Sequence, residues 1–190
     1  MRWNLDTTHA EVEFAVKHLM ISTVKGRFKT FAGTGETSPD GTLKSVEMTI
    51  ETASLDTNAQ QRDDHLRSPD FFDVASHPQI TFTSRTIRHH GPEVAITGDL
   101  TIRGTTQPVT LRGEYTAPTK DPWGNPRAAL AVSAKINRKD WGLGWNMALE
   151  AGGVVVGEEV KLSIEVEAVA AAEPAAIAAA EPTPVAAVTA

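Results

Sequence analysis

The chain has 190 residues, a length typical of one domain whose core needs neither a metal nor a disulfide to hold it. It contains no cysteine, which excludes thiol nucleophiles, thiolate metal sites and iron–sulfur clusters. Its 24 Asp and Glu residues outnumber 18 Lys and Arg residues, and the net charge of −6 argues against a nucleic-acid partner.

The first predicted strands lie close to the N-terminus. Residues 1–10 contain no apolar run of the length that a signal peptide needs, and no later stretch has the length and apolarity of a membrane span. We therefore expect a cytoplasmic protein with no integral membrane segment. Val12, Phe14 and Val16 then alternate with polar residues, which predicts a strand, and a second strand is predicted over residues 26–36.

A helical segment interrupts the strand pattern at residues 57–67. Thr57 and Gln60 have the spacing of a capping box, and Asp63 and Arg67 have that of an i,i+4 ion pair. Two adjacent phenylalanines follow the helix a few residues later. Such a short helical, aromatic insertion between strands is suited to cap one mouth of a barrel.

Six further stretches alternate between apolar and polar residues, as expected of an antiparallel sheet with one wet face and one dry face. With the two N-terminal strands they make about eight strands joined in order, which can close into an up-and-down barrel. We therefore predict an all-β fold, an extended eight-stranded antiparallel β-barrel with a short helical insertion capping one end. The six stretches cover residues 46–50, 80–82, 94–102, 109–115, 130–136 and 160–166.

The composition changes at Ala168, and the last 23 residues are mostly alanine with three prolines and two glutamates. Proline divides this stretch into pieces too short to form stable helices alone, and its small side chains bury little surface. We predict a folded domain over residues 1–167 and a flexible tail over residues 168–190. A helix that docks on a partner is the alternative interpretation of the tail.

The chain lacks the short motifs of the common enzyme classes. It contains no GxSxG elbow, P-loop or HExxH sequence, and its two glycine-rich strings do not complete a dinucleotide fingerprint. We therefore expect no catalytic residues and no cofactor. Asp63, Asp64 and His65 follow one another on the predicted helix, where successive residues turn by about 100° and cannot converge on one ion, so we predict no metal site.

The inward face of the strands leaves two interpretations open. The aromatic residues could fill the barrel, whereas small residues such as Gly98, Ala128 and Ala134 leave room for a cavity. His18 ends the row of Phe14 and Val16, and it is either a core histidine bonded to the backbone or a polar handle for an apolar ligand.

Four stretches resemble the YceI family of polyisoprenoid-binding proteins. They begin at Trp3 (WNLDTTHAEVEFAVKHLMISTVKGRF), Arg62 (RDDHLRSPDFFDVASHPQITFTS), Gly98 (GDLTIRGTTQPVTL) and Ile136 (INRKDWGLGWN). The resemblance extends to about Glu167 and implies a lipocalin-like barrel that holds a polyprenyl chain or an isoprenoid quinone, in a homodimer. Many members are periplasmic and carry a signal peptide. This sequence departs from that pattern, because we find no signal peptide in it.

On this resemblance we expect a non-enzymatic protein that binds, stores or transports an isoprenoid lipid, with transient membrane contact for lipid exchange. The alternatives are an enzyme acting on a prenylated substrate and a packed structural or stress-protective module without a ligand. The polar end of the ligand is expected near His18, Arg62 and His65. The side chains expected to line the cavity are Phe14, Val16, Phe28, Phe31, Leu66, Phe71, Phe72, Phe82, Leu100, Leu130, Val132, Trp141 and Trp145.

Overall fold

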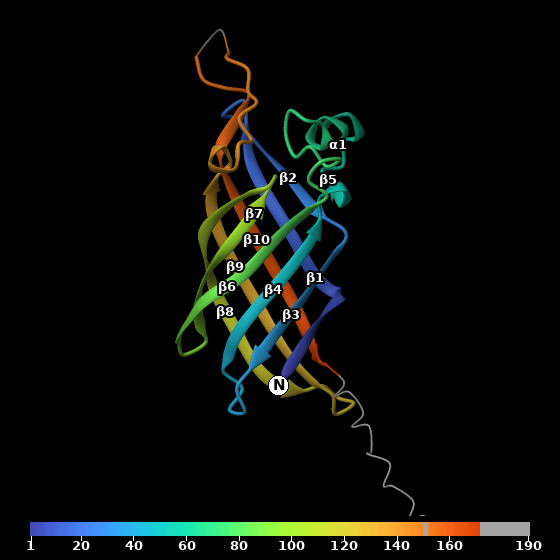
Figure 1. Ribbon diagram of the computed structural model, residues 1–190, viewed down its shortest axis with the longest axis vertical. Coiled ribbons are helices and arrows are strands. Elements are labelled where there is room, and N and C mark those ends of the chain that lie inside the picture. The colour runs from blue at the N-terminus through green and yellow to red at the C-terminus, as the bar shows by residue number, and fades with distance from the viewer. Residues whose placement is uncertain (150–151, 172–190) are drawn as a thin grey trace, which may run out of the picture.

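The computed structural model describes residues 1–149 and 152–171 of the chain. Its strands form one antiparallel sheet that curls into a tall barrel, with the N-terminus at one end and helix α1 at the other (Figure 1). The first and last strands pair with each other, which closes the sheet. The predicted all-β fold with an eight-stranded antiparallel barrel is confirmed.

Eight strands follow one another around the barrel in the order β1, β10, β9, β8, β7, β6, β4 and β3, which returns to β1. Their bounds are β1 (Arg2–His18), β3 (Phe31–Thr37), β4 (Leu43–Glu51), β6 (Gln79–His90), β7 (Glu93–Ile102), β8 (Thr105–Lys120), β9 (Pro126–Asn137) and β10 (Val156–Ala170). The remaining elements are β2 (Ser22–Phe28), β5 (Leu55–Asp56), α1 (Gln60–Arg67) and the 3-10 helices η1 (Thr52–Ser54) and η2 (Arg138–Trp141).

Two strands share one edge of β1. β2 pairs with the C-terminal part of β1, and β3 pairs with residues 2–4 at its start. The single strand predicted over residues 26–36 is wrong, because that stretch contains the end of β2 and most of β3, separated by Lys29 and Thr30. β2 also pairs with the short strand β5, which leads into the helical insertion and so brings that insertion to one end of the barrel.

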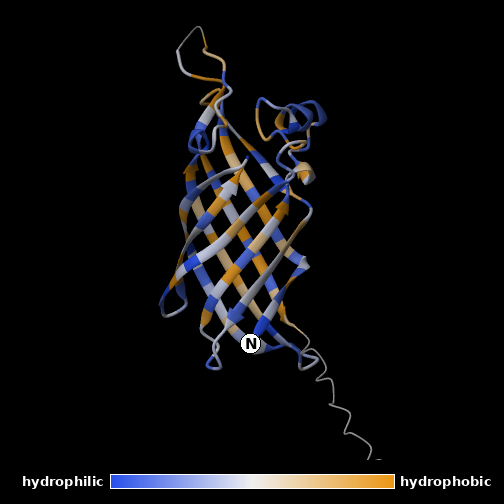
Figure 2. Ribbon diagram, in the orientation of Figure 1, coloured by the Kyte–Doolittle hydropathy of each residue, from blue (hydrophilic) through white to orange (hydrophobic). Residues whose placement is uncertain are grey.

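The alternation seen in the sequence sorts the side chains between the lumen and the solvent. Along β7 the even-numbered residues from Val94 to Ile102 are buried, and the residues between them are partly exposed. Figure 2 shows the same alternation of hydrophobic and hydrophilic residues along the strands around the barrel. The core of the molecule is therefore the inner face of the closed sheet.

The helical insertion is confirmed, but the local contacts predicted for it are wrong. Helix α1 begins at Gln60, after an N-cap residue whose side chain makes no capping bond. Thr57 instead donates from its backbone N and its hydroxyl to the buried carboxylate of Asp63, at 2.9 and 2.5 Å. Because Asp63 is engaged in this way, Arg67 lies against Asp64 instead, at 3.3 Å.

The last strand continues beyond the predicted domain boundary at residue 167. β10 ends at Ala170, which lies opposite Trp3 on β1, so the sheet holds three more residues than we expected. Residues 172–190, most of the predicted tail, are outside the described residues. Among the helices of the described part of the chain, none has the length and apolar character needed to cross a membrane.

Candidate functional site

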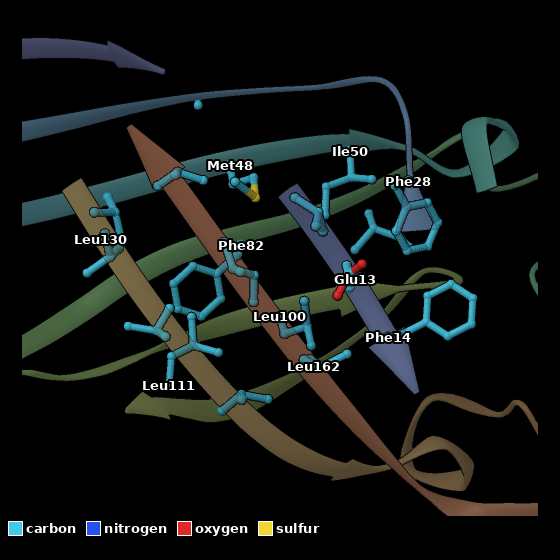
Figure 3. A pocket seen from close by; sticks show the side chains of 18 of the residues that line it. Glu13, Phe14, Phe28, Met48, Ile50, Phe82, Leu100, Leu111, Leu130 and Leu162 are labelled. Carbon is cyan, nitrogen blue, oxygen red and sulfur yellow. The ribbon is translucent and has the colours of Figure 1, made fainter. Parts of the chain in front are cut away.

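The barrel encloses a cavity of about 230 Å³. Each of the eight barrel strands contributes to the lining, which is mostly aliphatic and aromatic. Its polar members include Glu13, Glu47, Thr34, Thr37 and Arg138. Figure 3 shows Met48, Phe82, Leu111 and Leu130 on strands from different sides of the barrel. An engineered apolar cavity of about 150 Å³ stays free of water and binds benzene. A larger cavity with the same kind of lining favours a hydrocarbon ligand over water.

Aromatic side chains close the cavity at the end that carries the helical insertion. Leu66 of α1 and Phe71 and Phe72, which follow the helix, all border the cavity. The ring of Phe72 meets that of Phe28 on β2 at 6.1 Å between centroids, and Phe28 meets Phe14 on β1 at 5.6 Å. We call this end of the barrel the capped end.

A second group of rings joins the insertion to the segment that follows η2. His65 of α1 lies 4.7 Å from Trp145 and 5.0 Å from Phe71, and Phe71 lies 5.3 Å from Trp145, between ring centroids. Arg103, in the turn between β7 and β8, donates to the carbonyls of Pro69 and Gly142 at 2.8 and 3.2 Å. The cap is therefore held mainly by ring contacts and by bonds to backbone carbonyls.

Ten of the thirteen side chains predicted to line the cavity border it. Of the other three, Phe31 and Trp141 are buried in the core without bordering the cavity, and Trp145 packs in the cap. That these residues bind a ligand stays a prediction. The ten are Phe14, Val16, Phe28, Leu66, Phe71, Phe72, Phe82, Leu100, Leu130 and Val132.

The three residues predicted for the polar end of a ligand lie at the capped end but do not border the cavity. His18 is the last residue of β1, opposite Ser22. Arg62 donates to the hydroxyl and the carbonyl of Thr57, both at 2.7 Å, and His65 contacts Asp70 at 3.0 Å. Their contact with a ligand stays a prediction.

Sequence reasoning missed Arg138, the buried cation in the cavity wall. Its side chain is 4% exposed and donates to the backbone carbonyls of Gly157 at 2.9 Å, Val156 at 3.3 Å and Leu143. Burial lowers the pKa of its guanidinium, although nearby Glu158 partly offsets that effect. The even-numbered residues of β9 face the lumen, and residue 138 continues that row, so the alternation itself contained the signal.

Polar side chains of the cavity wall at the opposite end are bonded to the protein. Trp3 donates from its indole nitrogen to the hydroxyl of Thr37 at 3.0 Å, and Tyr115 donates from its hydroxyl to the carbonyl of Gly41 at 2.9 Å. Burial raises the pKa of Tyr115. We call this end, where the chain enters the barrel, the entry end.

An ion-pair network surrounds Arg127 at the entry end. Its guanidinium contacts the carboxylates of Asp6 at 2.9 Å, Asp121 at 3.1 Å and Glu167 at 3.2 Å. Hydrogen bonds from Thr8, from His9 and from Arg127 itself hold the pKa of Asp6 well below its usual range. Asp6, His9 and Glu167 also have a spacing that a metal ion could use, but the guanidinium already bonds two of them.

Comparison with known proteins finds relatives that are similar in sequence and others that are similar in fold. The family model of the YceI-like domain matches residues 3–168. Protein YceI of Escherichia coli and that of Shigella flexneri are each 43% identical over 164 residues, covering 85% of this chain and 82% of theirs.

Solved structures share the barrel. The YceI protein of Campylobacter jejuni is 31% identical with a TM-score of 0.71, and the match covers 82% of this chain and 90% of that one. BcnA of Burkholderia cenocepacia is 24% identical with a TM-score of 0.72, covering 86% and 98%. A polyisoprenoid-binding domain from Saccharophagus degradans is 16% identical with a TM-score of 0.63, covering 89% and 98%. The last two likenesses concern the fold alone.

Proposed function

The chain belongs to the family of YceI-like domains, and on that premise we propose that it binds the hydrocarbon chain of an isoprenoid lipid inside its barrel. The observation that carries the proposal is the cavity, which lies within a closed sheet and has an almost wholly apolar lining. The Saccharophagus degradans domain of similar fold is named for polyisoprenoid binding, which supports the same class of ligand.

The size of the cavity sets how much of a chain it takes. An engineered cavity of about 150 Å³ holds the six carbon atoms of benzene. At the same packing, the cavity of this barrel would hold roughly nine carbon atoms, close to two isoprene units. Burying them contributes about 7 kcal/mol at about 0.8 kcal/mol per carbon, whereas association costs about 4–15 kcal/mol. Tight binding therefore requires that more of the chain be buried, by displacement of rings such as Phe28 and Phe72.

Hydrocarbon contacts have no direction, so recognition of the head group depends on a few polar residues. Within the described hydrogen bonds, each terminal nitrogen of Arg138 uses one of its two N–H groups. A carbonyl or phosphate oxygen that enters the capped end would find its donors there. We keep His18, Arg62 and His65 as further candidates for contact with a head group outside the cavity.

We propose that the protein acts by binding rather than by catalysis, as a store or carrier of the lipid. An enzyme acting on a prenylated substrate is the competing function, and it depends on the side chains of α1. Asp64→Asn and His65→Ala variants test it in a turnover assay with a prenylated substrate. Our proposal expects no turnover in the unmodified protein and no loss of bound lipid in Asp64→Asn. Turnover in the unmodified protein that both variants abolish would favour the enzyme.

The direct test is the lipid content of the protein purified from a bacterial host. Organic extraction and mass spectrometry should give one dominant species whose mass series differs by isoprene units. Leu130→Arg places a charge in the lumen and should abolish retention, because an unpaired charge beside a hydrocarbon is not tolerated. Leu130→Trp fills the same space without charge and should reduce retention.

Ala131→Arg is the matched control, since Ala131 is exposed on the outer face of β9, opposite Glu114 and Glu165. This variant should keep its lipid. Circular dichroism must show intact strands in each variant. If extracts of the folded protein are empty, and added polyprenyl lipids and quinones also fail to bind, the carrier function is wrong and the packed module replaces it.

A further inference from the structure

Two loops project side by side beyond the capped end of the barrel (Figure 1). One is the turn between β1 and β2, and the other is the segment between η2 and β10. Leu19 of the first loop donates from its backbone N to the carbonyl of Val155 in the second at 2.8 Å. The side chain of Met20 also lies over Gly153. A Cβ at that position would be 3.8 Å from the Met20 Cγ, which is ordinary van der Waals contact.

Both loops expose large apolar side chains. Met20 is 61% exposed, Ile21 83% and Met147 59%, and Leu19 beside them is 37% exposed. We call these four residues the apolar tip. The sequence from His18 to Val24 has no Asp, Glu, Lys or Arg, and that from Trp141 to Gly157 has only Glu150, which is outside the described residues. Apolar surface gathered at one place on a protein marks a site of interaction.

The backbone of the tip is strained. Leu19 and Met20 have φ angles of 52° and 60°, a left-handed conformation that costs energy for residues with a Cβ and is usually occupied by Gly, Asn or Asp in such turns. The two side chains do not repay that cost by packing in the core, because both are exposed. Strain combined with exposure indicates that the tip serves a purpose other than folding.

Lysines lie on the outer face of the strands just below the tip. Lys25 on β2 and Lys161 on β10 are both opposite Ala15 on β1, and Lys161 is also opposite Lys135 on β9. Neighbouring strands are about 4.8 Å apart, so these three lysines form a short row across the barrel wall. Lys17, next to the turn, extends the group, which we call the basic belt.

The basic belt is locally positive on a chain whose net charge is −6. Lys135 pairs with Glu159 at 2.9 Å, whereas Lys17, Lys25 and Lys161 form no ion pair within residues 1–149 and 152–171. The three unpaired ammonium groups stand in solvent beside an uncharged apolar tip. That arrangement matches the surface of a bilayer, which offers phosphates at its headgroups and hydrocarbon beneath them.

We propose that the capped end of the barrel docks on the surface of an anionic lipid bilayer. The apolar tip enters the headgroup region, and the ammonium groups of the basic belt contact lipid phosphates. The proposal rests on the proposed function, because docking in this orientation brings the cap of the lipid-binding cavity to the source of the lipid.

Vesicle co-sedimentation of the full chain tests the proposal. Vesicles of phosphatidylcholine mixed with phosphatidylglycerol should bind the protein, and vesicles of phosphatidylcholine alone should bind it less. Ile21→Asp and Met147→Asp should each weaken binding roughly tenfold or more, because a carboxylate replaces an inserted apolar group. Lys25→Glu with Lys161→Glu should remove the preference for anionic vesicles, and added salt should have the same effect.

Trp123→Asp is the matched control, since Trp123 is 81% exposed in the turn between β8 and β9 at the entry end. It should leave vesicle binding unchanged. Equal losses from Trp123→Asp and Ile21→Asp, or equal binding to both kinds of vesicle, would overturn the proposal. So would a chain that binds no vesicle but forms a dimer that Ile21→Asp dissociates, which would make the tip a contact between two copies.

Lipid extraction from the same variants separates this proposal from the proposed function. Ile21→Asp should still carry the lipid loaded in the host, since Ile21 does not border the cavity. An unmodified protein that binds anionic vesicles but yields no lipid would contradict the proposed function and leave the docking surface standing. A protein that retains lipid but binds no vesicle would contradict the docking surface alone.

Discussion

The entry end and the capped end of the barrel are closed by different kinds of contact. At the entry end, Arg127 bonds three carboxylates, and the indole of Trp3 and the hydroxyl of Tyr115 bond to Thr37 and Gly41. At the capped end, phenylalanine rings, His65 and Trp145 meet by their faces and edges, and Arg103 adds two bonds to backbone carbonyls. Directional bonds fix one geometry, whereas ring contacts tolerate displacement, so the capped end is the better route for a ligand.

Arg138, like Arg103, makes directional bonds at the capped end, and its replacement should have the largest effect because its guanidinium is buried. Arg138→Met removes the buried guanidinium together with its three hydrogen bonds. The carbonyls of Leu143, Val156 and Gly157 then lack that donor. Because bonds to a charged group are worth about 1.5–3 kcal/mol each, we expect the free energy of unfolding to fall by about 3 kcal/mol or more. Urea unfolding measures it.

Arg127→Met at the entry end is the variant to compare with Arg138→Met. Arg127 is partly exposed to solvent, which screens its ion pairs, so we expect a clearly smaller loss than for Arg138→Met. If the two variants lose equal stability, the capped end depends no more on Arg138 than the entry end depends on Arg127. The comparison of the two ends would then need revision.

Loosening the cap should change the rate of ligand exchange more than the stability. Trp145→Ala removes the ring that meets both His65 and Phe71, without touching the cavity wall. An aromatic pair contributes about 0.5–1.5 kcal/mol, so release of a lumen-bound fluorescent prenyl probe should be about 2–10 times faster. Stopped-flow fluorescence measures that rate.

Tyr115→Phe is the control at the entry end, since it removes the bond to Gly41 and keeps the ring. It should leave the release rate unchanged. A faster release from Tyr115→Phe than from Trp145→Ala would place the exit at the entry end, contrary to our assignment.

The sequence predicted the barrel because alternation reports directly which face of a strand is dry. The same rule predicted Phe82, Leu100 and Leu130 on the inner face, and these three side chains border the cavity. It also pointed to Arg138, but a charged residue in an apolar row was not expected inside. Three backbone carbonyls make that burial acceptable. One belongs to Leu143, just after η2, and the other two belong to Val156 and Gly157 on β10, which are distant in the sequence.

Contacts within the insertion were predicted less well because several local partners compete. Thr57 and Gln60 have the spacing of a capping box. In the folded chain, however, the backbone N and the hydroxyl of Thr57 donate to the carboxylate of Asp63 instead. Trp145 was assigned to the cavity from its aromatic character, whereas the turn at η2 directs it to the cap. Neither outcome depends on periodicity, so neither could be deduced from it.

Acid should weaken the entry end, with the smallest effect of this series. The pKa of Asp6 in the folded protein lies below its unfolded value, because hydrogen bonds from Thr8, His9 and Arg127 favour the charged form. Asp6 therefore stabilises the fold above about pH 4, and that stabilisation is lost as the pH falls through its folded pKa. Asp6→Asn should be less stable at neutral pH and show a shallower fall in acid.

Thermal melts of the two proteins from neutral pH down to about pH 2 measure this difference. The Asp56 carboxylate belongs to another part of the chain and offers a control. Hydrogen bonds from Lys29 and from the backbone of Asn58 lower its pKa to about 2. The contribution of Asp56 to the fall of stability in acid should be unchanged in the Asp6→Asn variant. Identical pH profiles for Asp6→Asn and the unmodified protein would contradict the role of the network.

An isotope-filtered NOE spectrum tests most directly whether the lumen takes an isoprenoid chain. The protein is labelled with ¹³C in its methyl groups and mixed with unlabelled farnesol. We predict cross-peaks from the farnesol methyls to the lumen-facing methyls of Leu100, Leu130 and Val132. Cross-peaks confined to the exposed methyls of Met20, Ile21 and Met147, or none at all with a saturating ligand, would contradict binding inside the barrel.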